Sequence, residues 1–331
     1  MNEKRKQLLG SFLLGVLLPL TVLQFASITK PVVGVQTEPT ATAGTQLPTT
    51  EAPAQTEERW YIPVMIGSTV VTVELETYLT GVLLGEMPAY FEEEALMAQA
   101  VVARTYALYH HIRGYKHPGG AVCTDPGCCQ AYVAEAVYVE RGGREADVQK
   151  LRNAVEATAG VVLTYEGELI DATYFSCSGG KTESALAVWG AEVPYLQSVS
   201  SPGEESAEHY SDTVWFEGAD FQRLLGRSLS GSPGSWLGKV EYTVGGGVAT
   251  MIVGGRTYTG TELRALLGLN STAFDMRAEG SGISVTTRGK GHRVGLSQEG
   301  AEAMAAVGCT WEEIVSRYYV GTRIDKLTDI G

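Results

Sequence analysis

A charge-free, mostly apolar stretch at residues 8–28 restricts where the whole chain can lie. At about 1.5 Å per residue, a helix of that length crosses the roughly 30 Å hydrocarbon core of a bilayer. Lys4, Arg5 and Lys6 precede the stretch, which predicts a cytoplasmic N-terminus at residues 1–7. No clear Ala-x-Ala site follows, so an uncleaved single-pass membrane anchor is favoured over the alternative, a cleaved signal peptide. The rest of the chain is then expected to be extracytoplasmic.

Composition divides the rest of the chain into a linker and one folded region. Residues 29–58 are rich in Thr, Pro, Gln, Ala and Glu and poor in large apolar side chains, so they predict a flexible linker. Residues 59–331 predict one globular ectodomain. The chain has 25 basic against 38 acidic residues, which argues against a nucleic-acid partner because that partner requires a basic face.

The ectodomain alternates expected helices and hairpins without a regular βαβ rhythm, which predicts an α+β fold. Gly67-Ser68 separates two β-rich runs at residues 60–66 and 69–75, as a type II′ hairpin turn prefers. Helices are expected at residues 76–84 and 92–112, the second rich in small residues and packed on several sides. Further helices are expected at residues 146–158 and 261–267, from Ser297 and from Thr310, and further strands at residues 160–165, 169–175, 239–244, 248–253 and 283–287.

The densest pattern is Gly85-Glu86-Met87-Pro88, followed by the helical run at residues 94–107. Because a residue before proline avoids the helical conformation, the first helix must end close to Glu86. On these residues the chain resembles the stage II sporulation protein D family of peptidoglycan lytic transglycosylases. Further matching stretches lie at residues 174–183, 188–190, 194–196, 266–274, 289–301 and 318–322.

The resemblance implies a function and a catalytic residue. In that family one glutamate of the Glu-Met-Pro motif is the catalytic acid and base, and the matching residue is Glu86. The implied reaction cleaves the bond between N-acetylmuramic acid and N-acetylglucosamine in peptide-stripped glycan strands and leaves 1,6-anhydro-muramyl ends. The resemblance further implies work beside a peptidoglycan amidase and other engulfment proteins at the mother-cell membrane, in lobes around a glycan-binding cleft.

A single carboxylate is chemically sufficient for such a reaction. Most glycosidases use two carboxylates, one of them as nucleophile or base. In a lytic transglycosylase the C6 hydroxyl of the muramyl sugar attacks its own anomeric carbon, so one glutamate serves first as acid and then as base. Apolar Leu83, Leu84 and Met87 beside Glu86 favour the partial desolvation that keeps a carboxyl protonated. The alternative is an ordinary solvated glutamate at a helix end.

Several further residues are candidates for the same site. Arg104 lies in a helix of small apolar residues, where a guanidinium needs an anion or a carbonyl, so a catalytic contact with Glu86 or the substrate is predicted, with a solvated helix edge as the alternative. Gln99 and Tyr106 either bind substrate or are satisfied core polar groups. The other predicted substrate-binding residues are Tyr174, Ser176, Ser178, Lys181, Thr182 and His292.

Two glycine-rich segments carry most of those candidates. Gly179-Gly180 lets a backbone approach a sugar closely, although a tight structural turn is the alternative. His292 either orients a group of the site, binds sugar or makes a structural hydrogen bond. Arg293 stands where the family usually has glycine, so a positive φ there would strain the turn. Ser297 is expected to be a helix N-cap.

His117, Cys123, Cys128 and Cys129 form a second cluster in the sequence. Soft thiolates with an imidazole suit tetrahedral Zn²⁺, and four protein ligands leave no open position, so a structural zinc is predicted. Family members often carry a histidine where Cys128 stands, which preserves the ligand count. Free or disulfide-bonded cysteines are the alternative. Cys177 and Cys309 could pair if they were close.

Two other classes of function stay open at this point. A zinc-dependent cell-wall peptidase or amidase would need an open coordination site with a base near it. A non-catalytic glycan-binding scaffold would bind sugar without cleaving any bond.

Overall fold

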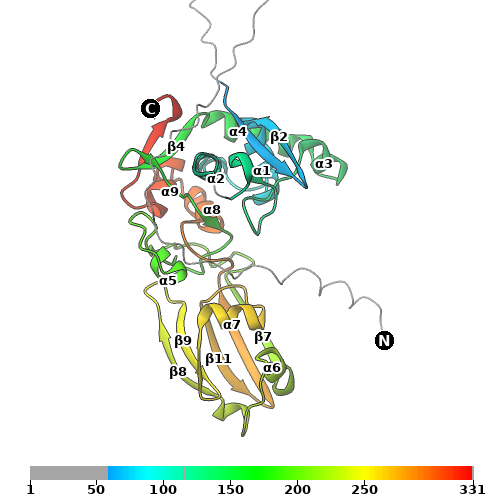
Figure 1. Ribbon diagram of the computed structural model, residues 1–331, viewed down its shortest axis with the longest axis vertical. Coiled ribbons are helices and arrows are strands. Elements are labelled where there is room, and N and C mark those ends of the chain that lie inside the picture. The colour runs from blue at the N-terminus through cyan, green and yellow to red at the C-terminus, as the bar shows by residue number, and fades with distance from the viewer. Residues whose placement is uncertain (1–58, 115, 330–331) are drawn as a thin grey trace, which may run out of the picture. The chain divides into compact units, whose positions relative to one another are not determined.

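The computed structural model describes residues 59–114 and 116–329. The predicted cytoplasmic segment, anchor and linker at residues 1–58 lie outside the described residues. Within the described ranges, no helix combines the length and the apolar character that crossing a membrane would need. The architecture is a mixture of helices and mostly antiparallel sheets, which agrees with the predicted α+β class (Figure 1).

The described chain opens with the predicted hairpin. Strands β1 (Tyr61–Ile66) and β2 (Thr69–Glu74) pair antiparallel, and Gly67 turns between them at φ 62°. A positive φ at the first turn residue is what a type II′ turn requires. Strand β1 also pairs in parallel with β3 (Val122–Cys123), which ties the start of the cysteine cluster to this sheet.

Helix α2 (Glu93–Arg113) is the centre of the helical region. It packs against α1 (Leu75–Glu86), α4 (Glu145–Ala157), α8 (Gln298–Ala306) and α9 (Trp311–Tyr318), as Figure 1 shows. Its small side chains allow neighbouring helices to approach on several sides, and they divide between two hydrophobic clusters. The prediction of a helix buried on several sides is confirmed.

The expected hairpin of residues 160–165 and 169–175 is only partly present. Strand β4 (Val161–Tyr165) pairs with the two-residue β5 (Glu168–Leu169) across a turn in which Glu166 and Gly167 have φ of 54° and 84°. The chain then leaves this sheet. Tyr174–Phe175 forms β6, which pairs in parallel with β13 (Leu296–Ser297). Because β13 leads directly into α8, this pairing brings two distant segments to one place.

Residues 211–288 have a hydrophobic core of their own. Two three-stranded antiparallel sheets, ordered β10-β9-β8 and β11-β12-β7, are covered by two short helices. Four of these elements, β7, α6, β10 and β11, are not predicted from the sequence. Strand β7, for example, is largely exposed and shows no clear apolar alternation. The elements are β7 (Ser211–Glu217), α6 (Gly218–Leu224), β8 (Leu237–Tyr242), β9 (Val248–Val253), β10 (Arg256–Thr259), α7 (Gly260–Leu267), β11 (Phe274–Glu279) and β12 (Gly282–Arg288).

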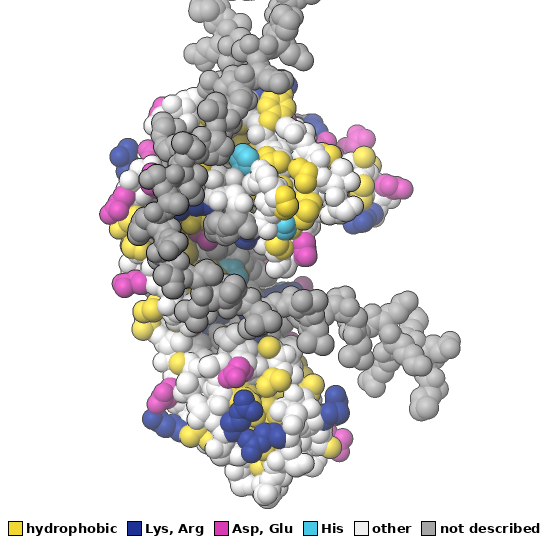
Figure 2. All heavy atoms as spheres, in the orientation of Figure 1, with side chains coloured by type: hydrophobic (Ala, Val, Ile, Leu, Met, Phe, Trp, Pro, Cys, Tyr) yellow, Lys and Arg dark blue, Asp and Glu magenta, His cyan; other side chains and the backbone are white. Residues whose placement is uncertain are grey.

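The two predicted C-terminal helices begin at their predicted caps. The Ser297 hydroxyl accepts the Gly300 N–H at the start of α8, and Thr310 with Glu313 forms a complete capping box at the start of α9. Figure 2 shows acidic and basic side chains interspersed over the face in view. The remaining elements are three short 3₁₀ turns (Pro118–Gly120, Pro233–Ser235 and Leu327–Asp329), α3 (Glu135–Glu140), α5 (Ala185–Trp189) and β14 (Arg323–Lys326).

Candidate active site around Glu86

Glu86 is the last residue of α1, at the element boundary that the sequence predicts. Met87 leaves the helix with φ −119° and ψ 137°, the extended conformation that a residue before proline adopts. Leu83, Leu84 and Met87 are buried, and Glu86 is partly buried among them. The carboxyl therefore lies in the partly desolvated setting expected for it.

Three segments of the chain meet at Glu86. The Ala131 N–H donates to Glu86 Oε1 at 2.6 Å, and the Tyr174 hydroxyl donates to the same oxygen at 3.1 Å. Gln298, the first residue of α8, donates from Nε2 to the Glu86 backbone oxygen at 3.3 Å. The parallel pairing of β6 with β13 places Tyr174 and Gln298 together, because the two strands run side by side into the site.

Burial raises the pKa of the Glu86 carboxyl, and the hydrogen bonds from Ala131, Tyr174 and Gln298 oppose that rise. These donors are an N–H, a phenol and an amide, all of them neutral groups. Desolvation without a neighbouring cation favours the protonated carboxyl. Glu86 can therefore carry a proton at higher pH than an exposed glutamate, as a general acid needs.

Arg104 pairs with Glu76 and not with Glu86, so the predicted contact with the Glu86 carboxyl is wrong. Its side chain is completely buried and pairs with Glu76, with Nη2 to Oε2 at 2.6 Å and Nε to Oε1 at 3.0 Å. Carbonyl oxygens of Val155 and Val161 accept its other N–H groups. A buried guanidinium needs these partners, and here they hold α1, α2 and β4 together.

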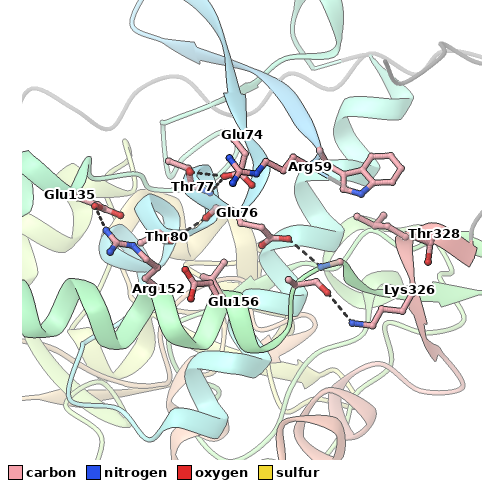
Figure 3. A pocket seen from close by; sticks show the side chains of 15 residues that line it. Arg59, Glu74, Glu76, Thr77, Thr80, Glu135, Arg152, Glu156, Lys326 and Thr328 are labelled. Atoms are coloured by element: carbon pink, nitrogen blue, oxygen red, sulfur yellow. Dashed lines mark hydrogen bonds and ion pairs between the residues drawn. The ribbon is translucent and has the colours of Figure 1, made fainter. Parts of the chain in front are cut away.

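Glu76 lies at the opposite end of α1 from Glu86, in a pocket of about 680 Å³ (Figure 3). It also accepts the Gly160 N–H at 3.2 Å. In Figure 3 the Glu135–Arg152 pair lies along the same pocket. This end of the helix is therefore rich in paired charges, whereas the Glu86 end has neutral donors.

Gln99 and Tyr106 are both buried in α2. Neither amide atom of Gln99 has a hydrogen-bond partner within the described residues. The Tyr106 hydroxyl receives a hydrogen bond from Lys116 Nζ at 2.5 Å, and its ring packs edge-on against Tyr174. Tyr106 thus supports a residue that touches Glu86, and substrate binding by either residue stays a prediction.

Ser178 and Thr182 are structural, contrary to the sugar-binding role predicted for them. The Ser178 hydroxyl donates to the buried carboxylate of Glu204 at 2.9 Å, and Thr182 Oγ1 accepts the Val199 N–H at 2.8 Å. Both side chains are completely buried. The sequence missed Glu204, which also accepts the Ser178 and Gly179 N–H groups at 2.8 and 3.0 Å and so holds the glycine turn.

Two residues of that turn keep accessible side chains. Lys181 is exposed, and Ser176 is partly buried. Their predicted contacts with substrate stay predictions.

His292 makes structural hydrogen bonds, one of the roles predicted for it, and its predicted contact with substrate stays a prediction. Its Nδ1 accepts the Val294 N–H at 3.1 Å, and its ring hydrogen-bonds the Tyr174 backbone. Burial lowers the pKa of His292 to about 4, so the ring is neutral at physiological pH. It packs against Phe175 and Trp189 and so fixes the strand that carries Tyr174.

Arg293 stands at a position where the family usually has glycine, and its φ is positive, at 66°. Its buried guanidinium donates to the carbonyl oxygens of Ser178 at 2.8 Å and Gly245 at 2.9 Å. Nη1 lies 3.7 Å from Oε1 of buried Glu183. These contacts offset the backbone strain that a non-glycine residue meets there.

The four predicted metal ligands lie together. One ligand atom from each of His117, Cys123, Cys128 and Cys129 lies within 4.8 Å of all the others. Cys128 Sγ is 3.3 Å from His117 Nε2. One imidazole and three thiols match the soft donor set that tetrahedral Zn²⁺ prefers, so the cluster fits a metal ion.

This cluster is close to Glu86 along the chain, because Ala131, whose N–H donates to the Glu86 carboxyl, is two residues after Cys129. Cys177 and Cys309 are free, and Cys177 Sγ donates to Glu204 Oε2 at 3.2 Å instead of forming a disulfide.

Comparisons with known proteins agree with the resemblance in the sequence. Residues 67–165, which include Glu86 and the cysteine cluster, match the family model described as stage II sporulation protein. The chain is 42% identical over 262 residues to stage II sporulation protein D of Bacillus subtilis (strain 168), covering 78% of this chain and 76% of that protein. It is 37% identical over 262 residues to stage II sporulation protein D of Bacillus amyloliquefaciens, with the same coverage of 78% and 76%.

A more distant relative carries a different name. The chain is 27% identical over 305 residues to the amidase enhancer of Bacillus subtilis (strain 168), covering 74% of this chain and 40% of that protein. The identity and coverage of the two stage II sporulation proteins, together with the matching motif around Glu86, show that this chain belongs to the stage II sporulation protein D family.

Proposed function

We propose that this protein is a peptidoglycan lytic transglycosylase with Glu86 as its acid and base. It cleaves the bond between N-acetylmuramic acid and N-acetylglucosamine in peptide-stripped glycan strands and leaves 1,6-anhydro-muramyl ends. The observation that carries the proposal is a partly buried carboxyl whose pKa is raised by burial and whose hydrogen-bond partners are neutral. A carboxyl in that setting can donate a proton and accept one back near neutral pH.

The proton balance of the reaction closes on one carboxyl. Protonated Glu86 first gives its proton to the glycosidic oxygen as the bond to the anomeric carbon breaks. The resulting carboxylate then takes the proton of the muramyl C6 hydroxyl, whose oxygen bonds to the anomeric carbon. Glu86 ends as it began, and no water is consumed.

The geometry suggests which carboxyl oxygen carries the proton. Ala131 and Tyr174 both donate to Oε1, so the transferable proton belongs on Oε2. The two donors also stabilise the carboxylate left after the first step. They therefore support the second half of the reaction, in which the carboxylate is the base.

The cysteine cluster is proposed to hold a structural Zn²⁺. His117, Cys123, Cys128 and Cys129 would be its ligands, and the ion would supply a fixed crosslink for the loop. Four protein ligands leave no open coordination position, which disfavours a zinc peptidase or amidase with the same metal as catalyst.

The setting of the reaction is proposed from the sequence and the relatives. The apolar stretch at residues 8–28 would anchor the protein in the cell membrane, with the catalytic region extracytoplasmic. The family is named for sporulation, and one relative is named an amidase enhancer, which supports work beside a peptidoglycan amidase during engulfment. A pull-down of the full chain with sporulating-cell amidases tests that partner, and recovery of none above background would contradict it.

The reaction is tested with purified protein and denuded glycan strands, with products identified by mass spectrometry. The wild type is expected to release anhydro-muramyl products, and Glu86→Gln is expected to release them at least about a hundredfold more slowly, the usual contribution of a general acid. Glu93→Gln, at an exposed position on α2, is the matched control. Reducing-end products from the wild type would indicate hydrolysis instead, and sugar binding without cleavage would indicate a scaffold.

A further inference from the structure

Gln130 is a completely buried glutamine between the cysteine cluster and the Glu86 site. It follows Cys129 directly and precedes Ala131, whose N–H donates to Glu86. Its side chain touches two tyrosines that come from different elements. No periodicity or motif in the sequence marks this residue.

Hydrogen bonds form a continuous chain through Gln130. The Tyr78 hydroxyl donates to Gln130 Oε1 at 3.3 Å, and Gln130 Nε2 lies 3.2 Å from the Tyr174 hydroxyl oxygen. The Tyr174 hydroxyl then lies 3.1 Å from Glu86 Oε1. The chain therefore links the interior side of α1 to the carboxyl at its end.

The direction of this chain is set by a backbone carbonyl. Gln130 Nε2 also points to the Ala103 oxygen at 3.5 Å, and a carbonyl oxygen can only accept. The amide nitrogen of Gln130, and not its oxygen, must therefore face Ala103 and Tyr174, so Nε2 donates to the Tyr174 hydroxyl oxygen. Because Tyr174 has one hydroxyl proton, that proton is left to point at Glu86.

On these contacts, and on the proposed function of Glu86, we infer that Gln130 is a positioning residue that acts through Tyr174 to aim a hydrogen bond at the carboxyl. Without Gln130, the Tyr174 hydroxyl loses the one side-chain donor that it has among residues 59–114 and 116–329, and it can turn away from Glu86. The carboxylate form of Glu86 then loses stabilisation, so Glu86 holds its proton to higher pH.

The inference is tested with Gln130→Met, Tyr174→Phe and the double variant in the full chain. The kcat/KM for denuded glycan strands is expected to fall as pH rises through the ionisation of free Glu86. This fall of kcat/KM at high pH is the basic limb of the pH profile. In both single variants the basic limb is expected to move to higher pH, by about one pH unit for Tyr174→Phe, the usual size of such a hydrogen-bond effect. Because Gln130 acts through Tyr174, the double variant is expected to match Tyr174→Phe alone.

Gln149→Met is the matched control, because Gln149 is an exposed glutamine on α4. If Gln130→Met fails to fold, Tyr78→Phe interrupts the same chain one bond further away and is expected to move the limb in the same direction by less. The inference would be overturned if the basic limb of the kcat/KM profile did not move in Gln130→Met. If Gln130→Met does not fold, an unmoved basic limb in Tyr78→Phe would overturn it. An equal further shift in the Tyr174→Phe background would also overturn it.

A readout independent of catalysis separates this inference from the proposed function. A ¹³C NMR titration of the carboxyl signal missing from Glu86→Gln gives the pKa of Glu86 directly. Gln130→Met is expected to raise that value even if the wild type releases no anhydro product. An unchanged value would reject Gln130 while leaving the proposed reaction standing.

Discussion

The two ends of helix α1 carry a glutamate each, and the two differ in what they meet. Glu76 at the first turn pairs with the guanidinium of buried Arg104, with a shortest contact of 2.6 Å. Glu86 at the last turn meets the Ala131 N–H and the Tyr174 hydroxyl, both neutral. The same side chain on the same helix thus pairs with a cation at one end and accepts from neutral donors at the other.

This difference gives the two carboxyls different electrostatic settings. A buried cation holds its partner ionised, whereas burial without a cation favours the protonated form. Arg104 projects from α2 toward the Glu76 end, where it also binds the carbonyl oxygens of Val155 and Val161. The Glu86 end is left to neutral donors, as the proposed acid role requires.

The largest expected effect comes from breaking the charged end. Glu76→Gln leaves the Arg104 guanidinium buried without its anion, so the free energy of unfolding is expected to fall by about 3 to 5 kcal/mol. Denaturant unfolding of the variant and the wild type measures it. A loss below about 1 kcal/mol would mean that the pair is an ordinary surface ion pair.

The cysteine cluster, with its proposed Zn²⁺, is expected to act on the other end of α1, through the loop that carries Ala131. Cys123→Ser removes a ligand, so the variant is expected to lose stoichiometric zinc. It should also lose about 3 kcal/mol of stabilisation when free zinc is a hundredfold above Kd. Zinc content is measured by elemental analysis, and stability by thermal unfolding with and without chelator. Full zinc content in the variant would remove Cys123 from the ligand set.

A third glutamate, Glu204, is a buried carboxylate whose partners differ from those of Glu76 and Glu86. It accepts the Ser178 and Gly179 N–H groups and so stabilises the glycine turn. Ser178→Ala removes a hydroxyl that donates to it at 2.9 Å and that accepts the Gly180 N–H. The expected loss is about 1 to 2 kcal/mol of stability, with glycan affinity unchanged, because the hydroxyl is buried. Lys181→Met is the comparison variant, at the exposed position of the same turn. Weaker glycan binding by Ser178→Ala at unchanged stability would restore a sugar-binding role for Ser178.

The smallest expected effect has the opposite sign. Because the pKa of Glu86 is raised in the folded protein, folding binds a proton that the unfolded chain releases sooner. Stability from this group is therefore full below its unfolded pKa and is lost as pH rises through the folded pKa. Glu86→Gln is expected to raise the free energy of unfolding at pH 7 by about 1 kcal/mol, because the amide places no charge in the partly desolvated site. The gain should shrink toward pH 4, and a loss at pH 7 would contradict it.

Local rules in the sequence predict the position of Glu86 at a helix end and the grouping of His117 with three cysteines. Pro88 forces the preceding residue out of the helix, so the end of α1 near Glu86 follows from chain sterics alone. The spacing of His117 and the three cysteines predicted a cluster because ligand chemistry depends on residue type. These features need only the residues next to them.

Partners chosen by tertiary packing could not be predicted in this way. The sequence predicts that Arg104 contacts Glu86 or the substrate. Its partner Glu76 lies at the other end of the same helix, and only the packing of α2 on α1 decides between the two glutamates. Ser178 similarly meets Glu204, which lies in a loop without any pattern. Gln130 depends on two tyrosines from separate elements, and a single buried glutamine leaves no trace in a hydrophobic pattern.

The central claim, that burial among neutral donors lets Glu86 carry a proton, is tested most directly by the titration of Glu86 itself. A ¹³C NMR titration of wild-type protein, with the Glu86 carboxyl identified by its absence from Glu86→Gln, measures that pKa. The account predicts a pKa above the usual 4.5 of a glutamate. A value at or below 4.5 would contradict it, because Glu86 would then be an ordinary carboxylate with no proton to give at neutral pH.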